Sequence, residues 1–350
     1  MDRTAVERIR NFVSGDTYVT RDPVYFDTYS TVSTISTMQF LFFRHVQFYS
    51  PHVLTIGNFD GVHLGHQRVI QQAQATAKEI GLPLTVLLFE PQPKEYFSLK
   101  QKEIPPARLM TLRAKAAALE ALGVDCIWCL KFSDVRPMTA DQFVDNFVMR
   151  KRVAHVVVGD DFRFGCDRVG DFSYLESVGR QFGLSVEQSE SHCIDGVRIS
   201  SSQIRNAVNL YDFDGAARLL GRPFSLCGRV IYGQQLGRQI GFPTANIALA
   251  KMPPLRGVFG CTVVCPNGRF VSGIANIGSR PTVSGQKMRL EVHLHKFSGE
   301  LYGLYLTITP RFFIRAEKKF ESVDALTKQI SVDNEKTLSR FRLLTGLKTE

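Results

Sequence analysis

The sequence of 350 residues contains no long apolar run. The longest early run, Phe40 to Phe43, ends at Arg44, and no stretch approaches the roughly 18 apolar residues of a membrane helix. We therefore predict no transmembrane helix, no signal peptide and no membrane partner. Lys and Arg form no run of about five or six like charges. The formal net charge of +10, dispersed in this way, indicates small phosphorylated ligands rather than nucleic acid and leaves oligomerisation open.

Cysteines with metal or redox spacing are also scarce. The chain has seven cysteines, and only Cys126 and Cys129 have CxxC spacing. They lie in an apolar run, DCIWCL, and positions three apart in a strand point to opposite faces. We therefore favour free thiols over a redox motif or a zinc half-site. Free thiols predict a cytoplasmic location.

One stretch, Val53 to Ile70, combines a strand, a glycine-rich turn and a helix. The apolar residues before Gly57 predict a buried strand, and helical spacing begins at Leu64. Glycines allow close approach of backbone N–H groups, and a helix N-terminus carries about half a positive charge. The turn therefore predicts a phosphate site.

Two histidines of this turn, His63 and His66, are candidate catalytic residues. Imidazoles placed there can donate hydrogen bonds to phosphoryl oxygens as charge develops in a transition state. A zinc site is the first alternative, although no third ligand of suitable kind lies nearby and a metal does not require the glycines. Two ordinary surface histidines are the second alternative.

Strands and helices alternate after this stretch, which predicts a parallel, doubly wound α/β sheet. Ligands of such sheets bind beyond the carboxyl ends of the strands, and three polar clusters follow predicted strands: Gly57–His66, Glu90–Pro93 and Gly159–Gly165. Thr139 and Gln142 predict a capping box. Further strands are predicted at Leu84–Phe89, Cys126–Leu130 and Ala154–Val158, and helices at Ala107–Leu122 and Ala140–Met149.

The stretch RISSSQIR, Arg198 to Arg205, places three serines at the start of another predicted helix. Hydroxyl groups and free N–H groups at a helix start form a second candidate phosphate site. A plain N-cap is the alternative, and it explains one serine but not three between two arginines.

The pattern changes after a short predicted helix, Tyr211–Leu220. From Phe224 onward, short alternating strands with glycine-rich turns predict a small closed barrel, with a hairpin at Asn267 and Gly268. A helix is predicted at Val323–Ile330, with a further helical stretch after Asp333. The length of the chain and its 44% hydrophobic content suffice for two globular cores.

The second half has no P-loop, because the Gly-Lys-Ser/Thr core is absent. Thr244 and Asn246 are hard oxygen donors on one side of an extended segment, where magnesium ligands would be needed. An ordinary turn is the alternative. Glu291 lies on the polar face of a predicted strand, where a carboxylate is either catalytic or merely solvated.

These motifs carry a resemblance that extends from about Val53 to Asp333. GNFDGVHLGH, FEPQP, VGDDFRFG and RISSSQIR resemble the adenylyltransferase half of bacterial bifunctional riboflavin kinase/FAD synthetases, which are HxGH nucleotidyltransferases. GFPTANI, ANIGSRPTV, LEVHL and RAEKKFESVDAL resemble the kinase module, a six-stranded barrel with a C-terminal helix. The resemblance implies an enzyme that converts riboflavin to FMN and FMN to FAD, with ATP as co-substrate and Mg²⁺ as cofactor.

The resemblance also implies roles for individual residues. His63 and His66 match the two histidines of the HxGH motif, and Glu291 matches the base that accepts the riboflavin hydroxyl proton. Gln92, Asp161 and Ser202 depart from the residues that are common in the family. The implied ATP and phosphate residues of the first half are Gly57, Asn58, Asp161, Arg198, Ser201, Ser202 and Arg205; those of the second half are Gly241, Thr244 and Asn246, the last two also binding the metal.

We therefore expect four segments: an N-terminal extension (1–37), an FMN adenylyltransferase domain (38–208), a linker helix (209–222) and a riboflavin kinase domain (223–346). Two alternative functions remain. Another HxGH nucleotidyltransferase fits the first half but leaves the barrel without a task. A flavin-binding module without turnover fits less well, because His63, His66 and Glu291 occur together.

Overall fold

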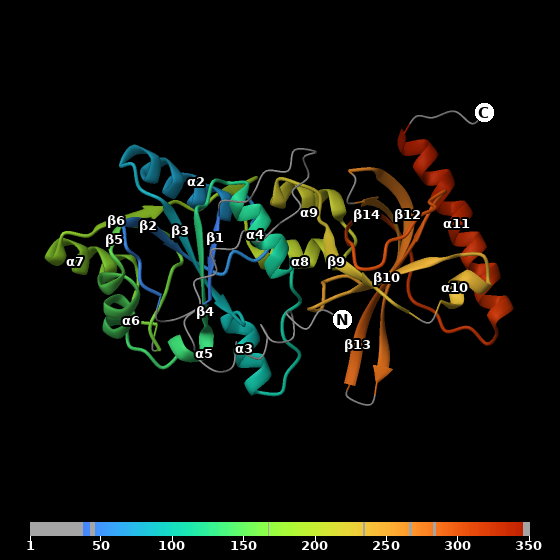
Figure 1. The fold of residues 1–350 in the computed structure, drawn as a ribbon, viewed down its shortest axis with the longest axis horizontal. Helices are drawn as coiled ribbons and strands as arrows, with labels where there is room; N and C mark the ends of the chain where they lie inside the picture. The colour runs from blue at the N-terminus through green and yellow to red at the C-terminus, as the bar shows by residue number, and fades with distance from the viewer. Residues whose placement is uncertain are drawn as a thin grey trace.

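The structure, a computed structural model, describes residues 38–42, 46–166, 168–233, 235–265, 268–282 and 285–345. The predicted extension 1–37 and Asn267 of the predicted hairpin lie outside these ranges. Figure 1 shows an α/β half and a barrel half side by side, with α8 and α9 between them and α11 against the barrel.

The first half is built on a parallel sheet of six strands in the order β1-β4-β3-β2-β5-β6. Its central strands are runs of apolar and β-branched residues that helices cover on both faces, so two of them are buried almost throughout and the third is buried at residues 156–158. The predicted doubly wound sheet is therefore confirmed. The strands are β1 (Gln39–Leu41), β2 (His52–Ile56), β3 (Leu84–Glu90), β4 (Cys126–Lys131), β5 (Val153–Gly159) and β6 (Ser185–Ser189).

The three predicted polar clusters follow β2, β3 and β5, which are neighbours in the sheet. Because all these strands run parallel, the three clusters lie at one edge, as the sequence predicted.

Several elements differ from the prediction. The helix predicted from Ala107 begins only at Leu112, because the Thr111 side chain caps the N–H of Ala114. The capping box of Thr139 and Gln142 is confirmed. The elements β1, α3, α5, α7 and β6 were not predicted. The helices are α2 (Leu64–Glu79), α3 (Pro93–Lys100), α4 (Leu112–Glu120), α5 (Phe132–Val135), α6 (Ala140–Phe147), η1 (Met149–Lys151), α7 (Phe172–Phe182), α8 (Ser201–Asn209) and α9 (Phe213–Leu220), with a small ribbon of β7 (Cys193–Ile194) and β8 (Val197–Arg198) before α8.

The second half is a closed antiparallel barrel in the order β10-β13-β12-β11-β14-β9. Alternating apolar residues fill its interior, which confirms the predicted barrel. The two helical stretches predicted near the C-terminus are one helix, α11 (Val323–Thr345). The other elements are β9 (Leu226–Ile231), α10 (Leu236–Gln239), β10 (Thr244–Ala248), β11 (Gly257–Val264), β12 (Phe270–Thr282), β13 (Gly285–Leu294) and β14 (Tyr305–Arg315).

The apolar core of the barrel continues into α8 and α9. Ile204, Val208 and Phe213 belong to the same buried cluster as barrel residues such as Phe259. Tyr211, between the two helices, stacks on Phe313 of β14 with ring centroids 4.0 Å apart. The helices that leave the α/β half are therefore packed on the barrel.

Polar contacts also join the two halves. Lys251, which follows β10, forms an ion pair with Glu95 of α3. Glu95 in turn pairs with Arg108, whose guanidinium also binds Glu90 through two hydrogen bonds of 2.9 and 2.7 Å. The backbone N–H of Arg108 donates to the carbonyl of Met252 at 2.8 Å. In the described part of the chain, no helix is both long enough and apolar enough to cross a membrane.

Candidate active sites

The turn between β2 and α2 places two histidines in contact. His63 is the N-cap of α2, and its Nδ1 atom accepts the backbone N–H of His66 at 3.3 Å. The two imidazoles stack with centroids 3.5 Å apart and planes 18° apart. Gly65 lies close to this pair, because a Cβ atom there would be 3.2 Å from Nδ1 of His63 and would push on the ring.

Both histidines are held in the neutral form. Burial lowers the pKa of His63 to about 4, and the charges of Arg222, Arg198 and Arg205 act in the same direction. Burial likewise lowers the pKa of His66 well below its ordinary value, and His63, Lys115 and Arg222 add to the effect. Because Nδ1 of neutral His63 accepts a hydrogen bond, its proton is on Nε2. His63 is therefore a neutral N–H donor.

The rest of the turn is fixed by Asp60, which is 2% exposed. One of its carboxylate oxygens pairs with Arg205 of α8 at 2.6 Å, and its backbone carbonyl accepts the Ser201 hydroxyl at 2.9 Å. Arg205 also donates to the carbonyl of Ala107 at 2.7 Å. Two residues predicted to bind phosphate therefore brace the histidine turn in this structure.

The other predicted residues of RISSSQIR lie in different surroundings. Ser200 is the N-cap of α8 and forms a capping box with Gln203, so the plain N-cap reading explains this serine. Ser202 is exposed on the first turn. Arg198 reaches across to the loop after β5, where it pairs with Asp160 at 2.9 Å and with Asp161 at 3.0 Å. The structure thus brings Arg198 and Asp161 together.

Gly57 and Asn58 begin the turn. The N–H of Gly57 donates to the carbonyl of Leu87 at 3.1 Å and so continues the sheet. The carbonyl of Asn58 accepts the ammonium group of Lys115 at 2.6 Å, while the Asn58 residue itself is exposed. Lys115 is 1% exposed, and its burial lowers the pKa of its ammonium group.

The two cysteines with CxxC spacing are buried, and their thiols stay protonated at neutral pH. Cys126 and Cys129 are free, and burial raises the pKa of each thiol to about 12. Within the residues that the structure describes, no group of three His, Cys, Asp or Glu side chains is arranged to hold a metal ion. Gln92 occupies the N-cap position of α3 without a capping hydrogen bond from its side chain, and it is 8% exposed.

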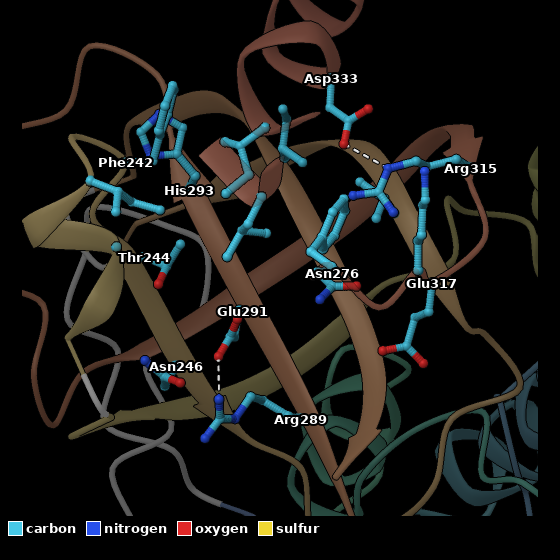
Figure 2. Close-up of a pocket in the computed structure, with 18 of the residues that line it drawn as sticks. Phe242, Thr244, Asn246, Asn276, Arg289, Glu291, His293, Arg315, Glu317 and Asp333 are labelled. Carbon is cyan, nitrogen blue, oxygen red and sulfur yellow. Dashed lines mark hydrogen bonds and ion pairs between the residues drawn. The ribbon is translucent and has the colours of Figure 1, made fainter. Parts of the chain in front are cut away.

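A second candidate site is a cavity of about 270 Å³ that opens between the barrel and α11. Thr244 and Asn246 of β10 and Glu291 of β13 line it together (Figure 2). Asn246 is directly opposite Glu291 on the neighbouring strand, and Asn276 of β12 is opposite Glu291 on the other side. Directly opposite residues share a face of the sheet, so these three polar side chains form one row.

Two ion pairs order the walls of this cavity. Arg289 donates to Glu291 at 2.7 Å, from the same strand and the same face. Arg315 of β14 pairs with the buried Asp333 of α11 at 2.8 Å and so attaches the helix to the barrel. Gly241 is in the turn before β10 with φ +82°, next to Phe242, which lines the cavity.

Several polar residues of the two sites were not predicted. Asn276 occurs in the quoted ANIGSRPTV stretch, and pairing this stretch with LEVHL would have placed it opposite Glu291. Arg289 is two residues before Glu291, and the period of a strand would have placed both on one face. Lys115 and Arg222 gave no local signal, because their partners are backbone carbonyls far away in sequence.

The fold and the two sites define a two-part transferase, in which a nucleotidyltransferase sheet with an HxGH turn is joined to a kinase-type barrel. The FAD synthetase family model matches residues 46–203, and the riboflavin kinase model matches residues 220–341. The chain belongs to the family of bifunctional riboflavin kinase/FMN adenylyltransferases. Its activities are the phosphorylation of riboflavin and the adenylylation of FMN, and its substrates are flavins and ATP.

Individual relatives agree with this assignment. The bifunctional riboflavin kinase/FMN adenylyltransferase of Pseudomonas fluorescens is 47% identical over 285 residues, which cover 80% of this chain and 90% of that protein. The enzyme of the same name from Haemophilus influenzae is 45% identical over 82% of this chain and 94% of its own length. A solved structure described as a macrolide-efflux protein from Streptococcus pneumoniae is similar, with a TM-score of 0.70 and 28% sequence identity. The match covers 85% of this chain and 98% of that chain.

Proposed function

We propose that the two activities use two separate sites, with adenylyl transfer at the turn of His63 and His66 and riboflavin phosphorylation at the cavity of Glu291. The observation that supports this division is chemical. The first site offers neutral N–H donors and nearby arginines, whereas the second offers a carboxylate in a row with amide and hydroxyl oxygens.

At the first site, a phosphate oxygen of FMN attacks the α-phosphorus of ATP, and pyrophosphate leaves with the electrons of the broken bond. Nε2–H of His63 and a ring N–H of His66 donate to the oxygens on which negative charge builds, and neutral donors of this kind are preorganised. Arg198, Ser201 and Ser202, with Asn58, Gly57, Arg205 and Asp161, are the proposed surroundings of the nucleotide. Catalysis is by positioning and charge stabilisation.

At the second site, the 5′-hydroxyl of riboflavin attacks the γ-phosphorus of ATP, and ADP leaves. Glu291 accepts the hydroxyl proton, which requires only hydrogen-bond reach from its carboxylate. Arg289 occupies one carboxylate oxygen at 2.7 Å and leaves the other for the hydroxyl. Thr244 and Asn246, after the turn at Gly241, are the proposed contacts with ATP.

A magnesium ion fits the second site. Thr244 and Asn246 lie on one side of β10 and line the same cavity as Glu291, with Asn246 directly opposite Glu291, and such hard oxygen donors suit Mg²⁺. When bound, the ion neutralises charge on the phosphates of ATP. We also propose the cytoplasm as the location of the protein, because all seven cysteines are free thiols. The proposed limits of the linker helix are 208/209 and 222/223.

The test uses the purified full chain with riboflavin, ATP and magnesium, and separates the flavins by chromatography over time. FMN should appear first and FAD later. His66→Ala should abolish FAD formation while FMN formation continues, and Glu291→Ala should form FAD only when FMN is supplied. Loss of both activities from either substitution would contradict the proposed division.

A further inference from the structure

Arg222 joins the end of the linker to the histidine turn. Its guanidinium donates to the carbonyl of Gly61 at 2.6 Å and to that of Val62 at 3.0 Å, and also to the carbonyl of Leu220 at 3.2 Å. Gln67 of α2 donates to the same Val62 and Leu220 carbonyls, each at 2.9 Å. The turn and the linker are therefore cross-linked by two side chains.

The turn needs such support because its backbone is strained. Phe59 and Val62 have φ angles of 46° and 41°, and Gly61 has φ +87°. The left-handed region is costly for β-branched and bulky residues and persists only where surrounding contacts impose it. Arg222 binds the carbonyls of Gly61 and Val62, directly before the N-cap His63.

The charge of Arg222 has only neutral partners. Its hydrogen-bond acceptors are carbonyls, and none of the carboxylates in the described ranges lies within ion-pair distance of it. Burial lowers the pKa of the guanidinium, which nevertheless stays charged at neutral pH. A cation that no carboxylate neutralises adds positive potential at the turn, where the proposed ATP phosphates bind.

Arg222 is not part of the sequence range that matches the FAD synthetase model. That range ends at 203, whereas the riboflavin kinase model begins at 220. We propose that Arg222, supplied by the kinase-matched part of the chain, is a positioning residue for adenylyl transfer that fixes the backbone before His63. This inference rests on the proposed role of the histidine turn.

The ionisation of His63 gives a direct readout of this contact. Besides burial, Arg222 is the first of three arginine charges that lower the pKa of His63; the others are Arg198 of β8 and Arg205 of α8. His66 stacks on the same ring, and Lys115 acts on His66 from α4. Removal of the Arg222 charge should therefore raise the pKa of His63 from about 4 toward 6.5.

The experiment compares Arg222→Met and Arg222→Lys with the control Arg218→Met, in the full chain. Arg218 is exposed on α9 and pairs with the exposed Asp195 at 2.8 Å, so its loss should change neither activity. For each variant, kcat and KM are measured for FAD formation from FMN and for FMN formation from riboflavin. The pKa of His63 is measured by NMR on histidine-labelled protein.

Arg222→Met should lower kcat for FAD formation at least tenfold while kcat for FMN formation stays within twofold, and should raise the pKa of His63. Arg222→Lys should recover part of the rate, because lysine keeps the positive charge but lacks the planar guanidinium fork whose two NH2 groups reach the carbonyls of Gly61 and Val62. A kcat for FAD formation within twofold of wild type overturns the proposal. If Arg222→Met loses FAD formation and FMN formation alike, Arg222→Lys decides. Equal falls of the two rates in Arg222→Lys also overturn the proposal.

A parallel His66→Ala sample distinguishes failure of the proposed function of the histidine turn from failure of the proposed role of Arg222. If His66→Ala retains FAD formation, the proposed function of the turn fails. If His66→Ala loses FAD formation and Arg222→Met keeps it, only the role of Arg222 fails.

Discussion

The Nδ1 atom of His63 accepts the backbone N–H of His66, so the first histidine caps the helix that carries the second. This contact needs an unprotonated Nδ1. The helix cap and the proposed hydrogen-bond donor on Nε2 therefore depend on the same neutral state of one imidazole.

A pH dependence of stability follows from this state. Between pH 6.5 and about 4, the unfolded chain binds a proton at His63 that the folded chain does not, so the free energy of unfolding falls as the pH decreases. The loss of free energy of unfolding is on the order of 3 kcal/mol once the pH is below both pKa values. Urea unfolding of wild type and His63→Gln at pH 7 and pH 4.5 should show a smaller loss in the variant, since glutamine keeps an acceptor but does not titrate.

His52, His66 and His295 provide a background to this measurement. Burial lowers the pKa of His52 and of His295 to about 4 and that of His66 well below its ordinary value, and all three contribute in the same direction in both proteins. Equal losses in wild type and His63→Gln would mean that His63 titrates normally.

Substitution of Lys115 should lower the rate of FAD formation while it leaves the free energy of unfolding almost unchanged. Lys115→Met removes the donor to the Asn58 carbonyl and also a buried ammonium group that lacks a carboxylate partner among the described residues. These effects oppose each other, so the free energy of unfolding should change by less than about 1 kcal/mol. FAD formation should fall about tenfold, because the turn loses a fixed contact at its start.

Lys78→Met is the matched control, since Lys78 is exposed in the last turn of α2. Comparable rates of FAD formation in both lysine variants would show that the Asn58 contact is dispensable. The rate of FMN formation should be unchanged in each.

Magnesium dependence of FMN formation tests Thr244 and Asn246, the proposed metal ligands of the second site. Asn246→Ala should raise the magnesium concentration for half-maximal FMN formation about tenfold or more, because one hard oxygen donor is lost. The same preparation should form FAD from FMN at the wild-type rate. Thr244→Val should act in the same direction, and a chelator should stop FMN formation in every variant. A wild-type magnesium profile in both variants would exclude these two side chains as ligands.

The contact between the two halves should contribute to stability through Glu95. Burial alone raises the pKa of this carboxyl, but Lys251 and Arg108 outweigh it and lower the pKa overall. The contribution of Glu95 to the free energy of unfolding is therefore complete above the ordinary pKa of a carboxyl group, and it is lost as the pH falls through the lowered pKa. Glu95→Ala should reduce the free energy of unfolding by about 3 kcal/mol at pH 7, because Arg108 stays buried with one carboxylate fewer.

Lys251→Met should cost less than about 1 kcal/mol, since the Lys251 side chain is 43% exposed. Urea unfolding can be followed by the fluorescence of the single tryptophan, Trp128, which is buried in the α/β half. Equal effects of the two substitutions would contradict the dominance of the Glu95–Arg108 pair.

The sequence was informative where local rules decide the structure. The apolar run before Gly57 and the helical spacing after Leu64 predicted the strand, the turn and the helix of the first site, and strand alternation placed Glu291 on the polar face. The single helix α11 was not predicted as one, because Asp333 interrupts its apolar periodicity. Asp333 is buried there because it binds Arg315.

Long side chains set the other limit of prediction. Arg205 and Ser201 were predicted as phosphate ligands, and the structure engages them with Asp60, which is more than a hundred residues earlier in the chain. Nothing in the local pattern states which of several polar groups a flexible arginine will reach. The start of α4 was misplaced because the segment before it is a loop, in which the backbone N–H of Arg108 donates to the carbonyl of Met252, and because Thr111 caps the helix.

Because Arg222 donates to the carbonyl of Gly61, the α/β half contacts a residue that lies beyond α9, at the start of the barrel half. The position of the junction therefore matters when the two halves are exchanged between proteins. A chimaera joined between α9 and Arg222 would give the sheet a foreign residue at the position that holds its strained turn. A junction placed after Pro223 would keep this arginine with the sheet that it contacts. Recombination between homologous genes should therefore be tolerated better on the barrel side of Pro223 than on the α9 side.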